Sequence, residues 1–258
     1  MSRIKQAFEN KKAFIAFVTG GDPDIETTEA LIPQMAQAGA DIIEIGIPFS
    51  DPIAEGVVIQ QADERALRAQ TTTDKLFDMV KRVRGQVDVP LVFMTYINPI
   101  YTYGTEKFMK KCAECGIDGV IVPDVPFEER QEVMDACDAQ GVELISMIAL
   151  TSKERINMIA KEARGFLYCV SSLGVTGVRN NITSNIREMV RQVKKVSDIP
   201  CAVGFGISTP KQAREMAAVS DGAIVGSAIV KIIAKYGKNC ISPVCDYIRE
   251  MKAAVEAA

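Results

Sequence analysis

The sequence predicts an α/β fold, a single (β/α)8 TIM barrel over residues 1–258 with an extra N-terminal helix and an insertion after the second strand. Short apolar runs rich in β-branched residues alternate with amphipathic helical segments eight times along the chain. Each unit spans about thirty residues, the length of a parallel strand with its crossover helix. Eight such units close into a barrel of about 250 residues, and no linker or charge run divides this chain. An open doubly wound sheet is the alternative, but it needs a topological switch point that the uniform pattern does not indicate.

Eight segments have the composition of buried strands. They are AFIAFVT (13–19), DIIEIGI (41–47), PLVFMTY (90–96), DGVIVPD (118–124), ELISMIA (143–149), FLYCVS (166–171), PCAVGFG (200–206) and DGAIVGS (221–227). Helical stretches of about ten to fifteen residues separate them, and Gly39, Gly116 and Gly141 are placed as helix C-caps. Ser208 is expected to begin a helix with Pro210 in its first turn.

Three helical segments lie outside this repeat. They are an N-terminal helix over 3–11, the insertion over 57–70 and a C-terminal helix over 243–256. Pro33 falls inside the first crossover pattern, so that helix is expected to kink there or to start late.

The composition is that of a soluble protein with a sizeable core, since 48% of the residues are hydrophobic and 24% are charged. Thirty Lys and Arg against 33 Asp and Glu give a net charge of −3, which offers no electrostatic basis for binding nucleic acid or an anionic membrane. The first twelve residues lack the apolar segment of a signal peptide, and no apolar run approaches the ~20 residues that span a bilayer. We therefore expect a cytoplasmic protein.

The cysteines and the absence of histidine limit the kinds of catalytic and metal site that this chain can form. The seven cysteines lie mostly in apolar runs, which favours a reducing compartment over a disulfide framework. Cys112 and Cys115 form a CxxC, but at the end of a predicted helix and without the second pair that a zinc site needs, so we interpret them as two thiols on a helix face. The absence of histidine excludes Ser-His-Asp and Cys-His nucleophiles and histidine-ligated metals. Acid–base chemistry must then use Asp, Glu, Lys, Tyr or Cys.

Glu44 is the candidate acid–base residue that the strand pattern singles out. Ile43, Ile45 and Ile47 share one face of the second strand and belong against the helices, so Glu44 points into the barrel near its upper rim. Active sites of such barrels form at the C-terminal ends of the strands. Poor solvation there should raise the pKa of Glu44 into the neutral range. The alternative is a buried glutamate neutralised by a nearby Lys or Arg.

Glu55 lies in the loop after that strand, above the same end of the barrel. A loop carboxylate alone is usually just solvated. Together with Glu44 it becomes a second acid–base group that faces the first across a bound substrate.

Three glycine-bearing loops late in the chain predict a phosphate site. They are SSLGVTGVRNN after the sixth strand, GFGIS after the seventh and VGSA after the eighth. Glycine lets backbone N–H groups approach an anion closely, and Ser227 adds a hydroxyl at a helix start. No GxGxxG follows the first strand, so a dinucleotide is not indicated.

Several segments together resemble the tryptophan synthase alpha chain family, in its order and spacing from end to end of the chain. They are FVTGGDPD (17–24), EIGIPFSDPIAEG (44–56), VPDVPFEE (122–129), GVTGVR (174–179), GFGIS (204–208) and IVGSAIVK (224–231). The resemblance implies a barrel enzyme that cleaves indole-3-glycerol phosphate to indole and glyceraldehyde 3-phosphate without a metal or a cofactor of its own. It implies that Glu44 protonates the indole ring carbon and takes the hydroxyl proton, while Glu55 accepts from the indole N–H.

The resemblance also implies the substrate contacts. Substrate would be bound by Phe17, Tyr96, Tyr168, Thr176, Gly177, Phe205, Gly206, Gly226 and Ser227. Within this set, Phe17, Tyr96 and Tyr168 line the indole pocket, and the glycines with Ser227 hold the phosphate. Residues 171–182 would form a closing lid.

A partner chain is implied as well. The family works with a beta chain that carries pyridoxal phosphate and receives indole through a tunnel in an αββα heterotetramer. The surface for that partner would include Asp51, Pro52, Asn98 and Pro126. One alternative is a non-catalytic subunit that binds and activates the beta chain, and another is a stand-alone lyase that releases free indole.

This chain departs from the family pattern at three places. Most members have Asp where Glu55 stands, and the extra methylene moves the carboxylate by ~1.5 Å, although a subset shares AEG. Val57 and Val58 stand where Pro-Thr or Pro-Val is usual, and Leu150 where proline is frequent. These differences bear on the rigidity of the loop after strand two more than on the reaction.

Overall fold

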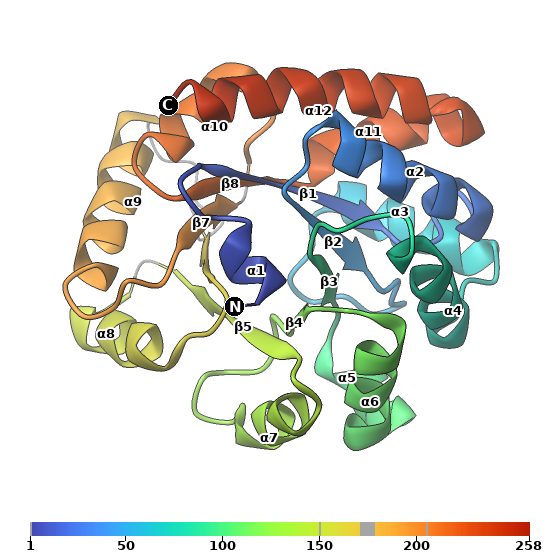
Figure 1. Ribbon diagram of the computed structural model, residues 1–258, viewed down its shortest axis with the longest axis horizontal. Helices are drawn as coiled ribbons and strands as arrows, with labels where there is room; N and C mark the ends of the chain where they lie inside the picture. The colour runs from blue at the N-terminus through green and yellow to red at the C-terminus, as the bar shows by residue number, and fades with distance from the viewer. Residues whose placement is uncertain (1, 150, 171–178, 205) are drawn as a thin grey trace.

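A computed structural model describes residues 2–149, 151–170, 179–204 and 206–258 (Figure 1). Within these ranges eight parallel strands form a closed barrel in which each strand pairs with the next and the last pairs with the first. The strands are β1 Ala13–Thr19, β2 Ile42–Gly46, β3 Leu91–Met94, β4 Gly119–Ile121, β5 Glu143–Ile148, β6 Leu167–Val170, β7 Cys201–Gly204 and β8 Gly222–Val225. The predicted TIM barrel is therefore confirmed, and the open sheet is wrong. The predicted strand ranges overrun some observed ends by one to three residues, because those residues belong to the flanking loops.

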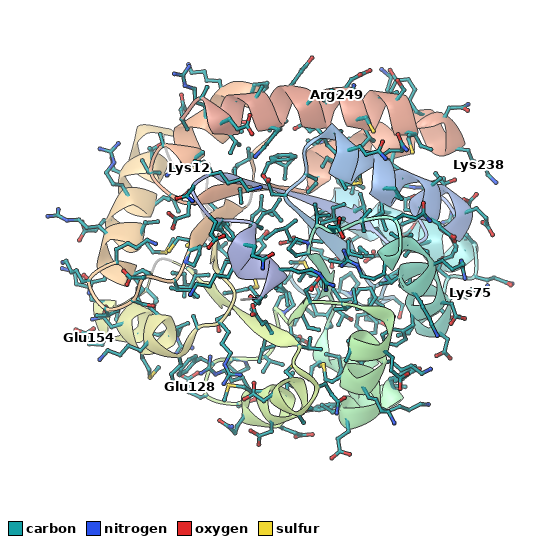
Figure 2. The ribbon with its side chains drawn as sticks, in the orientation of Figure 1. Lys12, Lys75, Glu128, Glu154, Lys238 and Arg249 are labelled. Carbon is teal, nitrogen blue, oxygen red and sulfur yellow. The ribbon has the colours of Figure 1, made fainter. Side chains whose placement is uncertain are left out.

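The helices surround the barrel (Figure 1). They are α1 Arg3–Gln6, α2 Ile25–Ala38, α3 Val57–Arg68, α4 Thr73–Arg84, α5 Ile97–Tyr103, α6 Thr105–Cys115, α7 Gln131–Gln140, α8 Lys153–Glu162, α9 Arg179–Val193, α10 Pro210–Ala217, α11 Ser227–Tyr236 and α12 Ile241–Glu256, with a 3-10 turn at Gly237–Asn239. Charged side chains of the outer helices, such as Lys75, Glu154 and Arg249, project from the periphery (Figure 2). No helix among the described residues is both long and apolar enough to cross a bilayer.

Side-chain alternation divides the core into two layers, as the strand pattern predicts. Ile43 and Ile45 pack in the layer between the strands and the helices. Ile42 and Val92 pack in a second layer inside the barrel. The same alternation places Glu44 on the inner face of β2.

The N-terminal segment closes the lower end of the barrel. Ile4 is fully buried and packs with the inner layer, and the Phe8 ring lies 5.7 Å from that of Phe166. Figure 1 looks onto this end, with α1 across the centre of the barrel. The predicted helix over 3–11 is wrong in length, since α1 ends at Gln6 and the chain turns until Asn10, whose φ of 55° is left-handed.

Helix termini agree with the sequence at the C-caps more closely than at the N-caps. Gly39, Gly116 and Gly141 all have left-handed backbone at a helix end, as predicted. The expected start at Ser208 is corrected to Thr209, whose side chain accepts from the Gln212 N–H in a capping box. Two further boundaries differ from expectation. Asp24 caps α2 well before Pro33, so that helix does not start late, and α12 begins at Ile241.

Two further helices, α3 and α5, follow the loops after β2 and β3 at the upper end of the barrel. The insertion after strand two is the helix α3. The short helix α5 directly follows β3 and was not predicted, because its sequence INPIYTY has little helical periodicity.

Three aspartates at the lower end, here called the floor carboxylates, join neighbouring strands. Asp41 accepts a hydrogen bond from the backbone N–H of Phe14 in β1, at 2.8 Å. Asp118 accepts from that of Leu91 in β3, at 2.9 Å, and Asp221 from that of Cys201 in β7, at 2.8 Å. Each is also ion-paired with lysine or arginine. The pairs are Asp41 with Lys11 and Lys252, both 2.6 Å; Asp118 with Arg3, 2.9 Å, and Arg84, 3.1 Å; and Asp221 with Lys194, 2.9 Å. These three carboxylates are therefore neutralised, hydrogen-bonded charges.

Candidate active site

A cavity of about 320 Å³ opens at the upper end of the barrel, where the strands have their C-terminal ends. This volume suits a small ligand. Side chains and backbone from all eight βα units line it, including these sequence-predicted residues: Phe17, Glu44, Glu55, Tyr96, Tyr168, Gly206, Gly226 and Ser227. We call this end of the barrel the mouth. The other substrate residues of the sequence prediction, Thr176, Gly177 and Phe205, and residues 171–178 of the expected lid lie outside the described residues.

Glu44 is completely buried at the bottom of this cavity. It pairs in register between Phe17 of β1 and Val92 of β3. Neither carboxyl oxygen has a hydrogen-bond partner among the described residues, and no ion pair reaches it there. Burial raises the pKa of Glu44 to about 8. The alternative of a glutamate neutralised by Lys or Arg finds no support in these contacts.

Two aromatic rings flank Glu44, and glycines make room for them. A Cβ at Gly204 would lie 2.4 Å from the Tyr168 hydroxyl oxygen, and one at Gly46 would lie 2.7 Å from the Phe17 ring. Burial, and secondarily the negative charge of Glu44, raise the pKa of Tyr168 well above its usual value. Tyr168 is therefore a neutral, largely apolar wall of the cavity at physiological pH.

Glu55 lies at the side of the cavity, half-buried, in the loop before α3. The backbone of this loop is held by two hydrogen bonds, from Ala54 N–H to the Tyr96 hydroxyl, 3.0 Å, and from the Gln60 amide to the Glu55 carbonyl, 2.9 Å. Burial raises the pKa of Glu55, and hydrogen bonding with Asp63 and Tyr96 opposes that rise. The loop thus carries a second carboxyl to the same cavity.

Asp63 of α3 is a residue that sequence reasoning missed. It is only 4% exposed, and burial together with the charge of Glu55 raises its pKa to about 9. The available signal was its place on the apolar stripe of α3, with Ile59, Ala62 and Ala66.

The part of the cavity lined by the segments after β7 and β8 has the features of an anion site. Gly226 and Ser227 stand at the N-terminus of α11, where backbone N–H groups lack helical partners. Gly206 has a φ of 77°, a conformation that glycine adopts without strain. Lys231 also lines the cavity, one helical turn after Ser227, and was not predicted.

The loops around the mouth expose apolar side chains. Asp51, Asn98 and Pro126 are exposed and Pro52 is half-buried, so the predicted partner residues lie at the surface. In the same loops and in the adjoining helices α3 and α5, Ile53, Val57 and Tyr101 are 79%, 65% and 52% exposed. Exposed apolar groups of this size are typical of an interaction surface.

Cys112 and Cys115 lie away from this site. Both are buried free thiols of α6, as the sequence indicates, and burial raises the pKa of each. They are therefore protonated core residues at physiological pH.

Comparison with known proteins gives one family throughout. A family model described as "Tryptophan synthase alpha chain" matches residues 2–256. The chain is 43% identical over 257 residues to a tryptophan synthase alpha chain of Lacticaseibacillus casei, covering 100% of this chain and 97% of that protein. It is 46% identical over 260 residues to that of Caldanaerobacter subterraneus, covering 99% and 97%. Among solved structures, tryptophan synthase subunit alpha from Legionella pneumophila superposes with a TM-score of 0.91 at 36% identity, covering 100% of both chains.

Proposed function

The chain belongs to the tryptophan synthase alpha chain family, lyases that cleave indole-3-glycerol phosphate in tryptophan biosynthesis, and we propose that Glu44 and Glu55 perform this cleavage here. The observation that carries the proposal is the unpartnered, fully buried carboxyl of Glu44 in a cavity that also holds Glu55 and an anion site. We further propose that a single domain spans residues 1–258, which the closed barrel supports.

Glu44 acts as the acid and then as the base. With a pKa near 8 it is protonated at neutral pH and gives its proton to the indole ring carbon that bears the glycerol chain. The resulting carboxylate takes the proton of the adjacent chain hydroxyl while the carbon–carbon bond breaks. The electron pair of that bond returns to the ring and restores indole, and the hydroxyl carbon becomes the aldehyde of glyceraldehyde 3-phosphate. Glu44 ends the cycle protonated, as it began.

Glu55 stabilises the charge that develops on the ring. Protonation of the ring carbon makes the indole nitrogen electron-poor, and a carboxylate that accepts from its N–H stabilises that state. The Tyr96 hydroxyl hydrogen-bonds with Glu55 and favours the ionised form that this role needs.

The remaining contacts orient the substrate. Phe17 and Tyr168 flank the ring. Gly206, Gly226 and Ser227 hold the phosphate at the N-terminus of α11, and Lys231 adds a positive charge nearby. Thr176, Gly177 and Phe205 complete these contacts in the proposal.

The family implies a beta chain as the partner. We propose that the partner surface is the mouth, where Asp51, Pro52, Asn98 and Pro126 surround the exposed side chains of Ile53 and Tyr101. In this proposal two alpha and two beta chains form an αββα heterotetramer, pyridoxal phosphate is held by the beta chain and none by this one, and indole passes through a tunnel.

The decisive experiment follows indole release from indole-3-glycerol phosphate by this chain alone and with a beta chain, for the wild type, Glu44→Gln and Glu55→Gln. We expect slow release alone, strong acceleration by the partner and a loss of at least about 100-fold in each variant. Glu64→Gln, on an exposed face of α3, is the matched control and should match the wild type. No release by the wild type with the beta chain still activated would instead identify a non-catalytic subunit, and release that the partner leaves unchanged would identify a stand-alone lyase.

A further inference from the structure

Asp63 occupies a position where an apolar side chain is expected. It lies on the stripe of α3 that packs inward, between Ile59 and Ala66, and is only 4% exposed. A carboxyl in such a place is costly unless it is paired or protonated. The ion pairs recorded for the described residues include none to Asp63.

The neighbours of Asp63 are other oxygen-bearing groups. Its carboxyl is within side-chain hydrogen-bonding reach of Glu55 and accepts from the backbone N–H of Phe49. The Tyr96 hydroxyl also hydrogen-bonds with Glu55. Asp22 lies farther away, and Arg65, the nearest cation of α3, is engaged in a bidentate pair with Asp22 at 2.7 and 2.8 Å.

Two carboxylates cannot hydrogen-bond to each other, because each is only an acceptor. The Glu55 Oε2 atom is buried and receives no hydrogen bond from any described donor. A single proton between the two groups satisfies both, as in carboxyl pairs that share a site. Burial and the charge of its neighbour favour Asp63 as the group that keeps the proton.

We propose that Asp63 is a positioning residue that shares one proton with Glu55 and holds the Glu55 carboxylate where the indole N–H requires it. The inference rests on the role proposed above for Glu55. The glutamate side chain has several rotatable bonds, and a donor from α3 fixes its end.

The test combines kinetics with a direct titration. The alpha chain with its beta partner is assayed for indole release as wild type, Asp63→Asn and Asp63→Ala, with Glu64→Gln again as the control on the same helix. Asp63→Asn keeps a donor of the same shape and should retain kcat within about 3-fold. Asp63→Ala frees Glu55 and should lower kcat on the order of 10–100-fold with a smaller change in KM.

The titration reports directly on the proton that Asp63 and Glu55 share. In protein labelled with 13C at the aspartate carboxyls, the resonance missing from Asp63→Asn belongs to Asp63. It should titrate far above the ordinary aspartate range in the wild type and at lower pH in Glu55→Gln, since the neighbouring charge is gone. A merely structural Asp63 would not respond to Glu55→Gln in this way.

The outcomes separate this inference from the proposed function. Loss of activity in Glu55→Gln with wild-type kinetics in Asp63→Ala would leave the lyase mechanism standing and overturn the role of Asp63. Titration of Asp63 in the ordinary acidic range, or equal losses in Asp63→Asn and Asp63→Ala, would also overturn it. Full activity of Glu55→Gln would instead defeat the proposed function, whatever Asp63 does.

Discussion

The three floor carboxylates and two carboxyls at the mouth, Glu44 and Asp63, have opposite surroundings. At the floor, Asp41, Asp118 and Asp221 each meet a lysine or arginine and a backbone N–H. At the mouth, Glu44 and Asp63 are more buried than these aspartates, yet the described residues offer them no ion pair. Burial alone therefore does not make a carboxyl chemically active. A nearby cation neutralises each floor carboxylate, whereas burial raises the pKa of Glu44 and Asp63, which have no cation paired with them among the described residues.

The floor carboxylates stabilise the fold. We therefore expect the largest change in the free energy of unfolding when one of them is removed. Asp41→Ala leaves the nearly buried Lys252 without its 2.6 Å partner and the Phe14 N–H without an acceptor. We expect the free energy of unfolding to fall by roughly 3–5 kcal/mol, with kcat per folded molecule unchanged. Urea unfolding monitored by circular dichroism, with an activity assay on the folded fraction, measures both. A matching loss of kcat would break the division between floor and mouth.

Ionisation of Glu44 at the mouth should lower the free energy of unfolding as the pH rises. The pKa of Glu44 is about 8 in the folded protein and near 4.5 when unfolded, so folding takes up a proton between these values. The stability contributed by this group is fully present below the unfolded pKa and is lost as the pH rises through the folded one. Between pH 5 and pH 7 the loss is about 3 kcal/mol, and Glu44→Gln should lack it. Parallel unfolding curves for both proteins at these pH values test the sign, and an identical pH dependence would refute it.

A smaller effect separates binding from chemistry within the mouth. Ser227→Ala removes a hydroxyl from the anion side of the cavity without touching either carboxyl. A lost hydrogen bond of about 1 kcal/mol raises KM about 5-fold and leaves kcat alone. Steady-state kinetics over a range of substrate concentrations decide this, and a fall in kcat alone would show that this side also serves the chemical step.

The smallest effect is expected outside both regions. Arg68 and Glu64 form an i,i+4 pair on α3 whose side chains are 78% and 62% exposed. Arg68→Ala should change the free energy of unfolding by no more than about 0.5 kcal/mol, because water and salt screen such pairs. A thermal melt at low and high salt checks this, and a large loss would mean that surface pairs here matter as much as the floor.

Much of this contrast was predictable from the sequence, and the rest depends on tertiary packing. The period of two along residues 41–47 was enough to place Glu44 inside the barrel, since the isoleucines had to face the helices. Asp63 was not found, because a single polar residue on an amphipathic helix looks the same whether it meets solvent or a second carboxyl.

The sequence predicted the ends of the helices only in part. Glycine C-caps were read correctly because they need a left-handed backbone. The start at Thr209 and the early end of α1 depended on which of several adjacent polar residues found a partner.

Helix α1, which closes the lower end of the barrel, has a consequence for hydrogen exchange at Glu44. Ile4 and the apolar layer above it separate Glu44 from water at the floor, so its exchange with solvent takes place through the mouth. Substrate that fills the cavity closes that route for the duration of a turnover. In the proposed mechanism, the hydrogen taken from the chain hydroxyl then stays on Glu44 until product leaves. In heavy water the substrate hydroxyl exchanges before binding and Glu44 exchanges through the mouth, so the released indole should carry deuterium at the ring carbon that Glu44 protonates.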